Sequence, residues 1–367
     1  MQPQHPYRWR RLLKDAVASA IWRVHEHPLS APLLSARCKV LVIGYHRVVE
    51  DFAAAAETDM PTLLTSRAMF ERHLDWIGRY FRFVTVDEIG QHVESGEPFA
   101  HPVAAITFDD GYQDTYEHAF PTLERKGIPA AVFVVTELVG GSRWQTHDRL
   151  YDLMLKAYPT WSDPRRGLTC LINDVGIPAS RVLPSRRDTA NAYRAASALL
   201  PQLSQSEVGR LIDGLHARVG RRTVGQAPLP LSWPMIADMR HAGVTIGSHT
   251  RTHVWLARES PQRTADEIAG SKRELERRLN EPVHHFAYPG GQFTPPIVDD
   301  VACAGYRFAY TACQHADRTR PALTIERLLL WERSSVDAQG AFSSAILNCQ
   351  THSLWPPARR CARVHSA

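Results

Sequence analysis

The sequence predicts an α/β fold in which parallel strands alternate with helices and close into a barrel. The main observation is a repeated unit in which a helix ends at a glycine and a short apolar strand follows. Three copies have helices at 114–126, 233–241 and 297–304 and strands at 130–135, 244–247 and 308–311, joined by Gly127, Gly243 and Gly305. Such alternation indicates a parallel sheet, and this number of units favours a closed or nearly closed barrel.

The other elements extend this pattern along the 367 residues. Strands are expected at 40–44 and 104–108, with a helix at 66–80 between them. A helix at 261–280 is strongly charged, and we expect its charges, including that of Glu267, to face solvent. Residues 142–231 break the alternation, are rich in Pro, Arg and Ser, and contain predicted helices at 148–157 and 204–219. The prediction is a barrel at 38–340 with a mainly helical insertion at 142–231, and a C-terminal tail at 341–367.

Residues 1–30 predict a separate amphipathic helix. Such a helix packs on the protein's own core or rests on the inner leaflet of a membrane, and the sequence leaves both open. No apolar run here is long enough for a signal peptide or a membrane span. Together with six scattered cysteines that show no metal-binding or disulfide pattern, this favours a cytoplasmic protein, peripheral to the inner membrane if the helix binds lipid. The apolar face contains Trp9, Leu12, Leu13, Ala16, Val17, Ala20, Ile21 and Val24, opposite Arg8, Arg10, Arg11, Lys14 and Arg23.

Composition narrows the class of protein. Hydrophobic residues make up 44% and charged residues 22%, which is typical of a globular protein with a substantial core. The formal net charge is +5, without a block of Lys and Arg or a basic stripe interleaved with aromatic residues. We therefore expect no nucleic-acid partner.

Reactive side chains follow three predicted strands, at the strand ends where α/β barrels build their active sites. The first segment is Thr-Phe-Asp-Asp-Gly at 107–111, with adjacent carboxylates at Asp109 and Asp110. Two adjacent buried acids are reasonable when one binds a cation and the other titrates nearby. Taken alone, Asp-Asp-Gly is also a common turn.

The second segment is Ser-His-Thr-Arg-Thr-His at 248–253, and the third is Phe-Ala-Tyr-Pro-Gly-Gly at 286–291. Two histidines four residues apart can share one metal ion. The third segment is a turn that can direct a backbone N–H into a cleft, as in an oxyanion hole. Asp110, His249 and His253 together give three ligands and an open position, which is the pattern of catalytic zinc.

These three segments resemble the motifs of the polysaccharide deacetylase family (NodB homology, carbohydrate esterase family 4), over roughly residues 40–331. The resemblance implies a distorted (β/α) barrel of about seven parallel strands. It also implies metal-dependent hydrolysis of N-acetyl groups from an amino-sugar oligosaccharide or polysaccharide, with release of acetate and a metal-bound water as nucleophile. Asp109 would be the general base, Asp110, His249 and His253 the metal ligands, and the Tyr288 backbone N–H an oxyanion donor.

Two features depart from the family pattern. Many members carry an arginine shortly before the third motif to orient the base, but here His284 and His285 occupy that stretch, and Arg327 is an alternative source of the group. The late histidine motif that supplies the general acid is also not evident. Tyr45 and His46 resemble the first strand end of circularly permuted relatives that act on poly-N-acetylglucosamine, which implies His46 as general acid.

Zinc is the expected metal because the ligand set is two histidines and one aspartate, although cobalt, nickel and manganese suit a similar set. The expected partner is an N-acetylated amino-sugar intermediate of exopolysaccharide biosynthesis. Two alternatives stay open. One is an amidohydrolase of the same fold acting on a non-sugar amide, and the other is a non-catalytic carbohydrate-binding protein. The presence of the base and all three ligands argues against the second.

Overall fold

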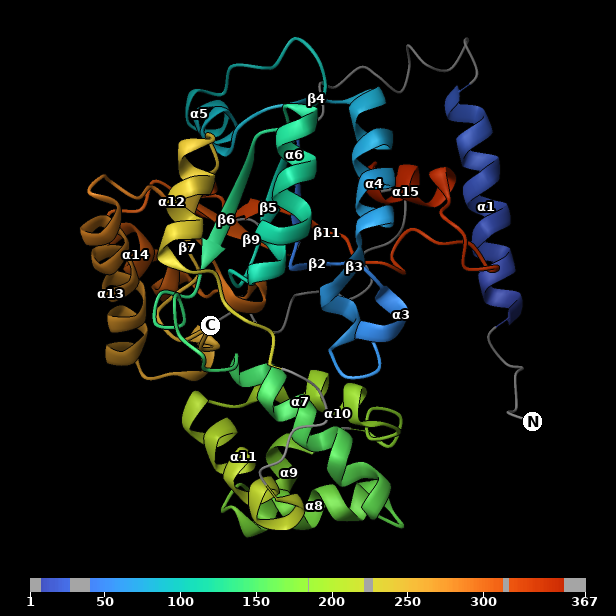
Figure 1. Ribbon diagram of the computed structural model, residues 1–367, viewed down its shortest axis with the longest axis vertical. Helices are drawn as coiled ribbons and strands as arrows, with labels where there is room; N and C mark the ends of the chain where they lie inside the picture. Colours follow the sequence, from blue (N-terminus) through green and yellow to red (C-terminus); the bar gives the residue numbers. More distant parts are fainter. Residues whose placement is uncertain (1–7, 27–39, 184, 221–226, 313–316, 353–367) are drawn as a thin grey trace.

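The computed structural model describes residues 8–26, 40–183, 185–220, 227–312 and 317–352. At its centre, parallel strands wind into an almost closed barrel surrounded by helices (Figure 1). Eight strands follow one another in the order β10-β9-β8-β7-β6-β5-β1-β11, and β4 also pairs with β5. The predicted α/β barrel is confirmed, with eight strands on this path where about seven were expected. The strands are β1 Val40–Tyr45, β4 Arg82–Phe83, β5 Val103–Phe108, β6 Ala130–Val134, β7 Thr245–Ser248, β8 His285–Ala287, β9 Phe308–Thr311, β10 Ile325–Glu326 and β11 Leu328–Leu329.

One short segment links the two ends of the strand order. β10 pairs with β9 and β11 pairs with β1, and Arg327 alone separates β10 from β11 in the chain. The segment therefore joins the last strand of the path to the first. Its position buries Arg327, which is only 3% exposed.

Both faces of the central strands are covered. All six residues of β5 are buried. Ala104, Ile106 and Phe108 pack in the core cluster shared with the surrounding helices. Val103 and Ala105 point the other way, into a cluster with side chains from β1, β6 and β9 inside the barrel. This two-residue alternation explains why the strand is apolar throughout instead of alternating with polar residues.

Helices with clear start and stop signals cover the outside of the barrel (Figure 1). The Ser66 hydroxyl accepts a hydrogen bond from the Met69 N–H at the start of α4. Ser260 caps α13 in the same way, and Asn280 ends α13 in the left-handed conformation. The small strands β2 (Arg47–Val49) and β3 (Leu64–Ser66) pair beside the barrel. The covering helices are α3 Phe52–Ala55, α4 Arg67–Tyr80, α5 Val86–Ser95, α6 Phe120–Lys126, α12 Trp233–His241, α13 Pro261–Leu279 and α14 Pro295–Cys303.

Residues 146–219 form a helical unit with its own hydrophobic cluster, below the barrel in Figure 1. Ser204 and Glu207 form a capping box at the start of its last helix. Helices predicted at 148–157 and 204–219 correspond to α7 and α11, and three further helices lie between them. The five are α7 Thr146–Ala157, α8 Pro164–Asp174, α9 Ala179–Val182, α10 Ala192–Leu199 and α11 Gln205–Val219.

The first and last described helices pack together at one side of the barrel (Figure 1). In α1 (Arg8–Glu26), Ala18 is buried against α15 (Ser344–Thr351), and the Trp22 ring lies 6.1 Å from that of Trp76. The segment expected to be a tail at 341–367 therefore includes a packed helix, because α15 supplies the apolar surface on which α1 rests. Residues 353–367 lie outside the described residues. No helix in the described part of the chain is both long and apolar enough to cross a bilayer.

Candidate active site

The three predicted metal ligands converge at the carboxyl end of the barrel. Asp110 follows β5, while His249 and His253 lie in the loop after β7, which we call the histidine loop (residues 249–253). Asp110 Oδ1 lies 3.1 Å from Nε2 of His253 and 3.6 Å from Nε2 of His249. One potential ligand atom from each residue lies within 4.8 Å of the other two.

The donor atoms at this centre fit a divalent cation. Nδ1 of His249 lies 2.8 Å from the carbonyl oxygen of Ala287. A carbonyl only accepts hydrogen bonds, so Nδ1 carries the proton and Nε2 presents its lone pair toward Asp110. Among the described residues, the buried Asp110 Oδ1 has no hydrogen-bond partner of normal geometry, even though His253 is close. A carboxylate oxygen and imidazole nitrogens that face one another in this way are the ligand set of a zinc-type site.

The backbone is strained at the ligands. Asp110, Thr250 and His253 have φ angles of 70°, 68° and 59°, in the left-handed region that side chains disfavour. In the described chain only one further non-glycine residue, Asn280, has a positive φ. Such conformations cost on the order of 1–3 kcal/mol each and persist where surrounding contacts impose them. The conformation of the histidine loop must therefore be held by neighbouring elements.

Helix α13 provides that support through Glu267. Its carboxylate accepts hydrogen bonds from the backbone N–H groups of Arg251 (3.0 Å) and Thr252 (2.9 Å) and from the Thr252 hydroxyl (2.7 Å). Glu267 is 3% exposed, so the expectation that it faces solvent was wrong. Burial of this carboxylate is favourable because it satisfies two N–H groups of the histidine loop.

Arg327 holds the predicted base. Its Nη1 and Nη2 donate to Oδ1 and Oδ2 of Asp109, each at 2.7 Å, and Nη1 also donates to the Thr107 hydroxyl at 3.2 Å. Burial alone would raise the pKa of Asp109, but the charge and hydrogen bonds of Arg327 outweigh it and hold that pKa below its ordinary value. Asp109 is therefore a carboxylate at neutral pH, in one fixed orientation. The alternative source of the orienting arginine that the sequence offered is the one in contact.

His46 lies at the end of β1, beside both carboxylates. Its backbone carbonyl accepts the Thr115 hydroxyl at 3.3 Å, and its side chain is half-buried. The preceding residue, Tyr45, pairs with Phe108 of β5, and its carbonyl accepts the Asp109 N–H at 2.9 Å, so His46 follows a strand end next to the one that carries Asp109 and Asp110.

Tyr288 is engaged in other contacts, which corrects its expected role. Its backbone N–H donates to the carbonyl of Tyr310 at 3.0 Å, and its hydroxyl donates to the carbonyl of Leu323 at 2.9 Å. The N–H predicted as an oxyanion donor is therefore already used to pair the chain after β8 with β9. The turn at 289–291 packs against Trp255. A Cβ on Gly290 would lie 2.0 Å from the Trp255 ring, so this close packing requires glycine.

The insertion contributes side chains that the sequence did not identify. His147 at the start of α7 is buried, its Nε2 lies 3.9 Å from Asp110 Oδ2, and its ring centroid lies 4.9 Å from that of His253. The Tyr112 hydroxyl lies 2.7 Å from Asp148 Oδ2 and 2.8 Å from His147 Nε2. A hydroxyl has one proton, so Tyr112 donates to Asp148 and accepts from the Nε2–H of His147. No metal or catalytic spacing in the sequence points to these residues, because the insertion folds back onto the barrel.

Comparison with known proteins shows which family and fold this chain resembles. The sequence profile described as polysaccharide deacetylase matches residues 96–157 and 200–309. The chain is 26% identical over 93 residues to the putative polysaccharide deacetylase YxkH of Bacillus subtilis, covering 25% of this chain and 33% of that protein. It is 27% identical over 124 residues to a poly-beta-1,6-N-acetyl-D-glucosamine N-deacetylase of Staphylococcus aureus, covering 32% and 42%. The matches thus span less than half the length of these curated relatives.

Solved structures show the same fold. The Streptococcus pyogenes deacetylase PplD, in complex with acetate, superposes with a TM-score of 0.53 at 17% identity, over 86% of this chain and 99% of that chain. IcaB from Ammonifex degensii gives a TM-score of 0.52 at 20% identity, over 86% and 97%. At these identities the likeness establishes the fold, and the chemistry rests on the side chains described above.

Proposed function

Because the chain belongs to the polysaccharide deacetylase family, we propose that it hydrolyses N-acetyl groups from an amino-sugar oligosaccharide or polysaccharide. Asp110, His249 and His253 would hold a divalent cation, with zinc as the first choice for this ligand set. When bound, such a cation supplies Lewis acidity, which makes water more acidic and polarises a carbonyl. The protein's own residues orient the substrate and move the protons.

Asp109 acts as the general base in this proposal. Its carboxylate takes a proton from the water that adds to the acetamide carbonyl carbon, and Arg327 keeps both oxygens in place during the transfer. The C–N bond then breaks, acetate forms, and the leaving amine takes a proton. His46 is the donor of that proton in this proposal, because it follows β1, which pairs with the strand that ends at Asp109 and Asp110. Acid–base catalysis of this kind typically contributes ~10²–10⁴-fold in rate.

One observation carries the proposal. The buried Asp109 carboxylate is held by Arg327, and the next residue, Asp110, lies with His249 and His253 in the predicted metal site. The test is acetate release from N-acetylglucosamine oligomers by wild-type protein and by Asp109→Asn. Each is assayed after chelation and again after zinc is restored. We expect release that disappears with chelator, returns with metal, and is absent in the variant under all conditions.

Other outcomes separate the alternatives. Stoichiometric metal binding without release from any oligomer would favour a non-sugar amide as substrate. Absence of both metal binding and release would contradict the proposal and favour a non-catalytic carbohydrate-binding protein. A matched control is Asp213→Asn, which changes an exposed aspartate on α11 and should leave release unchanged.

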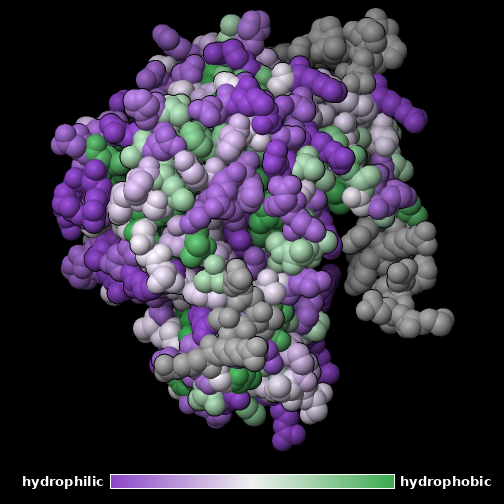
Figure 2. All heavy atoms as spheres, viewed as in Figure 1, coloured by the Kyte–Doolittle hydropathy of each residue, from purple (hydrophilic) through white to green (hydrophobic). Residues whose placement is uncertain are grey.

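We also propose that α1 rests on the cytoplasmic face of the inner membrane, where a lipid-linked glycan intermediate would be met. Leu12, Leu13 and Val17 are 47%, 55% and 40% exposed, and Figure 2 shows hydrophobic residues interspersed with hydrophilic ones along the edge of the molecule that α1 occupies. An outward apolar face of this kind inserts at the level of lipid headgroups. Co-sedimentation with phosphatidylglycerol vesicles, lost in Leu13→Asp, would support this location, and equal sedimentation of both proteins would contradict it.

A further inference from the structure

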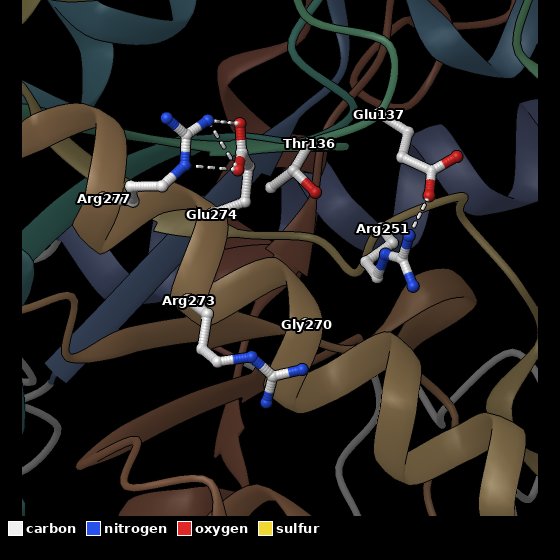
Figure 3. Close-up of a pocket in the computed structure, with 7 residues that line it drawn as sticks. All are labelled: Thr136, Glu137, Arg251, Gly270, Arg273, Glu274 and Arg277. Carbon is white, nitrogen blue, oxygen red and sulfur yellow. Dashed lines mark hydrogen bonds and ion pairs between the residues drawn. The ribbon is translucent and has the colours of Figure 1, made fainter.

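A surface hollow lies on the α13 side of the histidine loop. It is a groove of about 490 Å³ between α13 and the end of β6, shown in Figure 3. Arg251, which lines it, belongs to the histidine loop that carries two of the proposed metal ligands. We call it the arginine groove; its lining residues are Thr136, Glu137, Arg251, Gly270, Arg273, Glu274 and Arg277.

At one end of the arginine groove, a single carboxylate serves two arginines. Glu137 pairs with Arg251 and also lies 3.5 Å from Arg143. The side chain of Arg251 runs against α13 at Gly270, where an added Cβ would lie 2.5 Å from Arg251 Cδ. Glycine weakens a helix interior. Its presence at position 270 is explained by the close approach of Arg251, which leaves no room for a larger side chain.

The other end repeats the two-to-one ratio. Glu274 lies 2.7 Å from Arg277 and 2.9 Å from Arg278. Between the two ends lies the exposed guanidinium of Arg273, which makes no hydrogen bond or ion pair with any of the described residues (Figure 3). Among the lining residues, three arginines face two glutamates, and Arg273 is the arginine without a carboxylate partner in the described structure.

We propose that the arginine groove binds an anionic group, a phosphate or a carboxylate, carried by the molecule that is deacetylated. Guanidinium groups present planar pairs of donors that match both anions, and their weak hydration favours binding at a surface. Arg251 of the histidine loop lines the groove, so in this proposal one extended glycan spans the groove and the metal centre. Naming the ligand as part of a glycan rests on the proposed function, whereas the affinity of the groove for anions does not.

The experiment measures anion binding in the absence of turnover. Chelated, metal-free protein is titrated by calorimetry with inorganic pyrophosphate and, separately, with glucuronic acid oligomers. Wild type is compared with Arg273→Ala and with a matched control, Arg186→Ala, which removes an exposed arginine in the helical insertion. Charged hydrogen bonds of this type are each worth about tenfold or more in affinity. We expect Arg273→Ala to weaken binding about tenfold, with the control unchanged.

Each outcome has one meaning. Binding of pyrophosphate alone identifies a phosphate as the natural group, and binding of the glucuronate oligomer alone identifies a carboxylate; both support the groove. No binding of either anion, or an equal loss in the Arg186→Ala control, overturns it. The titration uses metal-free protein and does not depend on turnover. A negative result in the deacetylase assay therefore does not affect the binding result, and a negative binding result does not affect the deacetylase assay.

Discussion

Arg327 and Asp109 form a buried bidentate ion pair, with both guanidinium Nη atoms 2.7 Å from a carboxylate oxygen. Arg327 is also the only residue between β10 and β11, the strands at the two ends of the barrel path. The group that orients the proposed base is therefore part of the segment that closes the barrel. Orientation of Asp109 and closure of the fold depend on the same residue.

Arg327→Lys should separate orientation from charge. Lysine keeps the positive charge but offers a point donor instead of a planar pair, so Asp109 loses its fixed orientation. We expect kcat/KM for acetate release to fall on the order of 10²-fold, with a smaller effect on thermal unfolding. Arg327→Ala should also destabilise the fold by about 3–5 kcal/mol, because it leaves a buried carboxylate without a partner.

Steady-state kinetics and thermal unfolding of both variants check this prediction. Arg307→Lys is a suitable control because that arginine is an exposed partner of Glu94. Wild-type kcat/KM in Arg327→Lys would contradict an orienting role.

Glu267→Ala should weaken metal binding. The variant leaves the N–H groups of Arg251 and Thr252 without their acceptor, in a loop that already holds Thr250 and His253 at positive φ. Loss of such supporting hydrogen bonds typically costs 10–100-fold in metal affinity or activity. Calorimetric titration of metal-free protein with zinc measures the effect, and Asp266→Ala, at an exposed position of the same helix, is the control. Equal affinities in the two variants would show that the loop holds its own conformation.

The site residues that could be predicted are those that a short local sequence pattern identifies. Asp109, Asp110, His249 and His253 follow apolar strands directly, and parallel strand ends meet at one edge whatever the detailed packing. Glu267 could not be predicted, because a charged helix with i, i+4 pairs has the same composition whether one glutamate points inward or outward. Its burial is decided by the approach of the histidine loop.

The insertion shows the same limit on a larger scale. Its first and last helices were predictable from capping and apolar spacing, but α8, α9 and α10 are short and lie among Pro- and Arg-rich sequence. The contact between His147 and Asp110 depends on how α7 docks on the barrel, which no local pattern encodes. Tyr288 illustrates the opposite error: the motif located its turn correctly, while strand pairing decided what its N–H contacts.

His147 and Tyr112 should act as one unit. The hydroxyl of Tyr112 links His147 to Asp148, and the imidazole lies against Asp110 and His253. His147→Phe and Tyr112→Phe each remove this hydrogen bond while keeping an aromatic ring in place. We expect each to lower the rate of acetate release about tenfold, in the range for groups that support a metal site.

A double-mutant cycle checks the coupling. If the two groups act through their shared hydrogen bond, the double variant should be no slower than either single variant. Multiplied effects of the two substitutions would contradict the coupling and indicate independent contacts with substrate. Metal affinity measured on the same proteins separates a loss of the cation from a loss of turnover.

Asp148 should make the folding stability depend on pH. It is 5% exposed, and burial raises its pKa to about 7, against opposing effects of the Arg47 charge and the Tyr112 hydrogen bond. An acid whose pKa is raised on folding holds its proton more tightly in the folded state. Its contribution to stability is therefore fully present below the ordinary pKa of 3.8 and is lost as the pH rises to about 7.

Asp148→Asn removes this dependence and keeps an oxygen that accepts the Tyr112 hydroxyl. We expect its unfolding temperature to exceed that of wild type at pH 8, by about 2–4 °C or more, and the difference to shrink as the pH falls toward 4. Thermal unfolding across this range is the measurement, with Asp213→Asn expected to follow the wild-type curve. Parallel curves for wild type and Asp148→Asn would mean that Asp148 ionises equally well in the folded and unfolded chain, so that its burial beside Tyr112 has no energetic consequence.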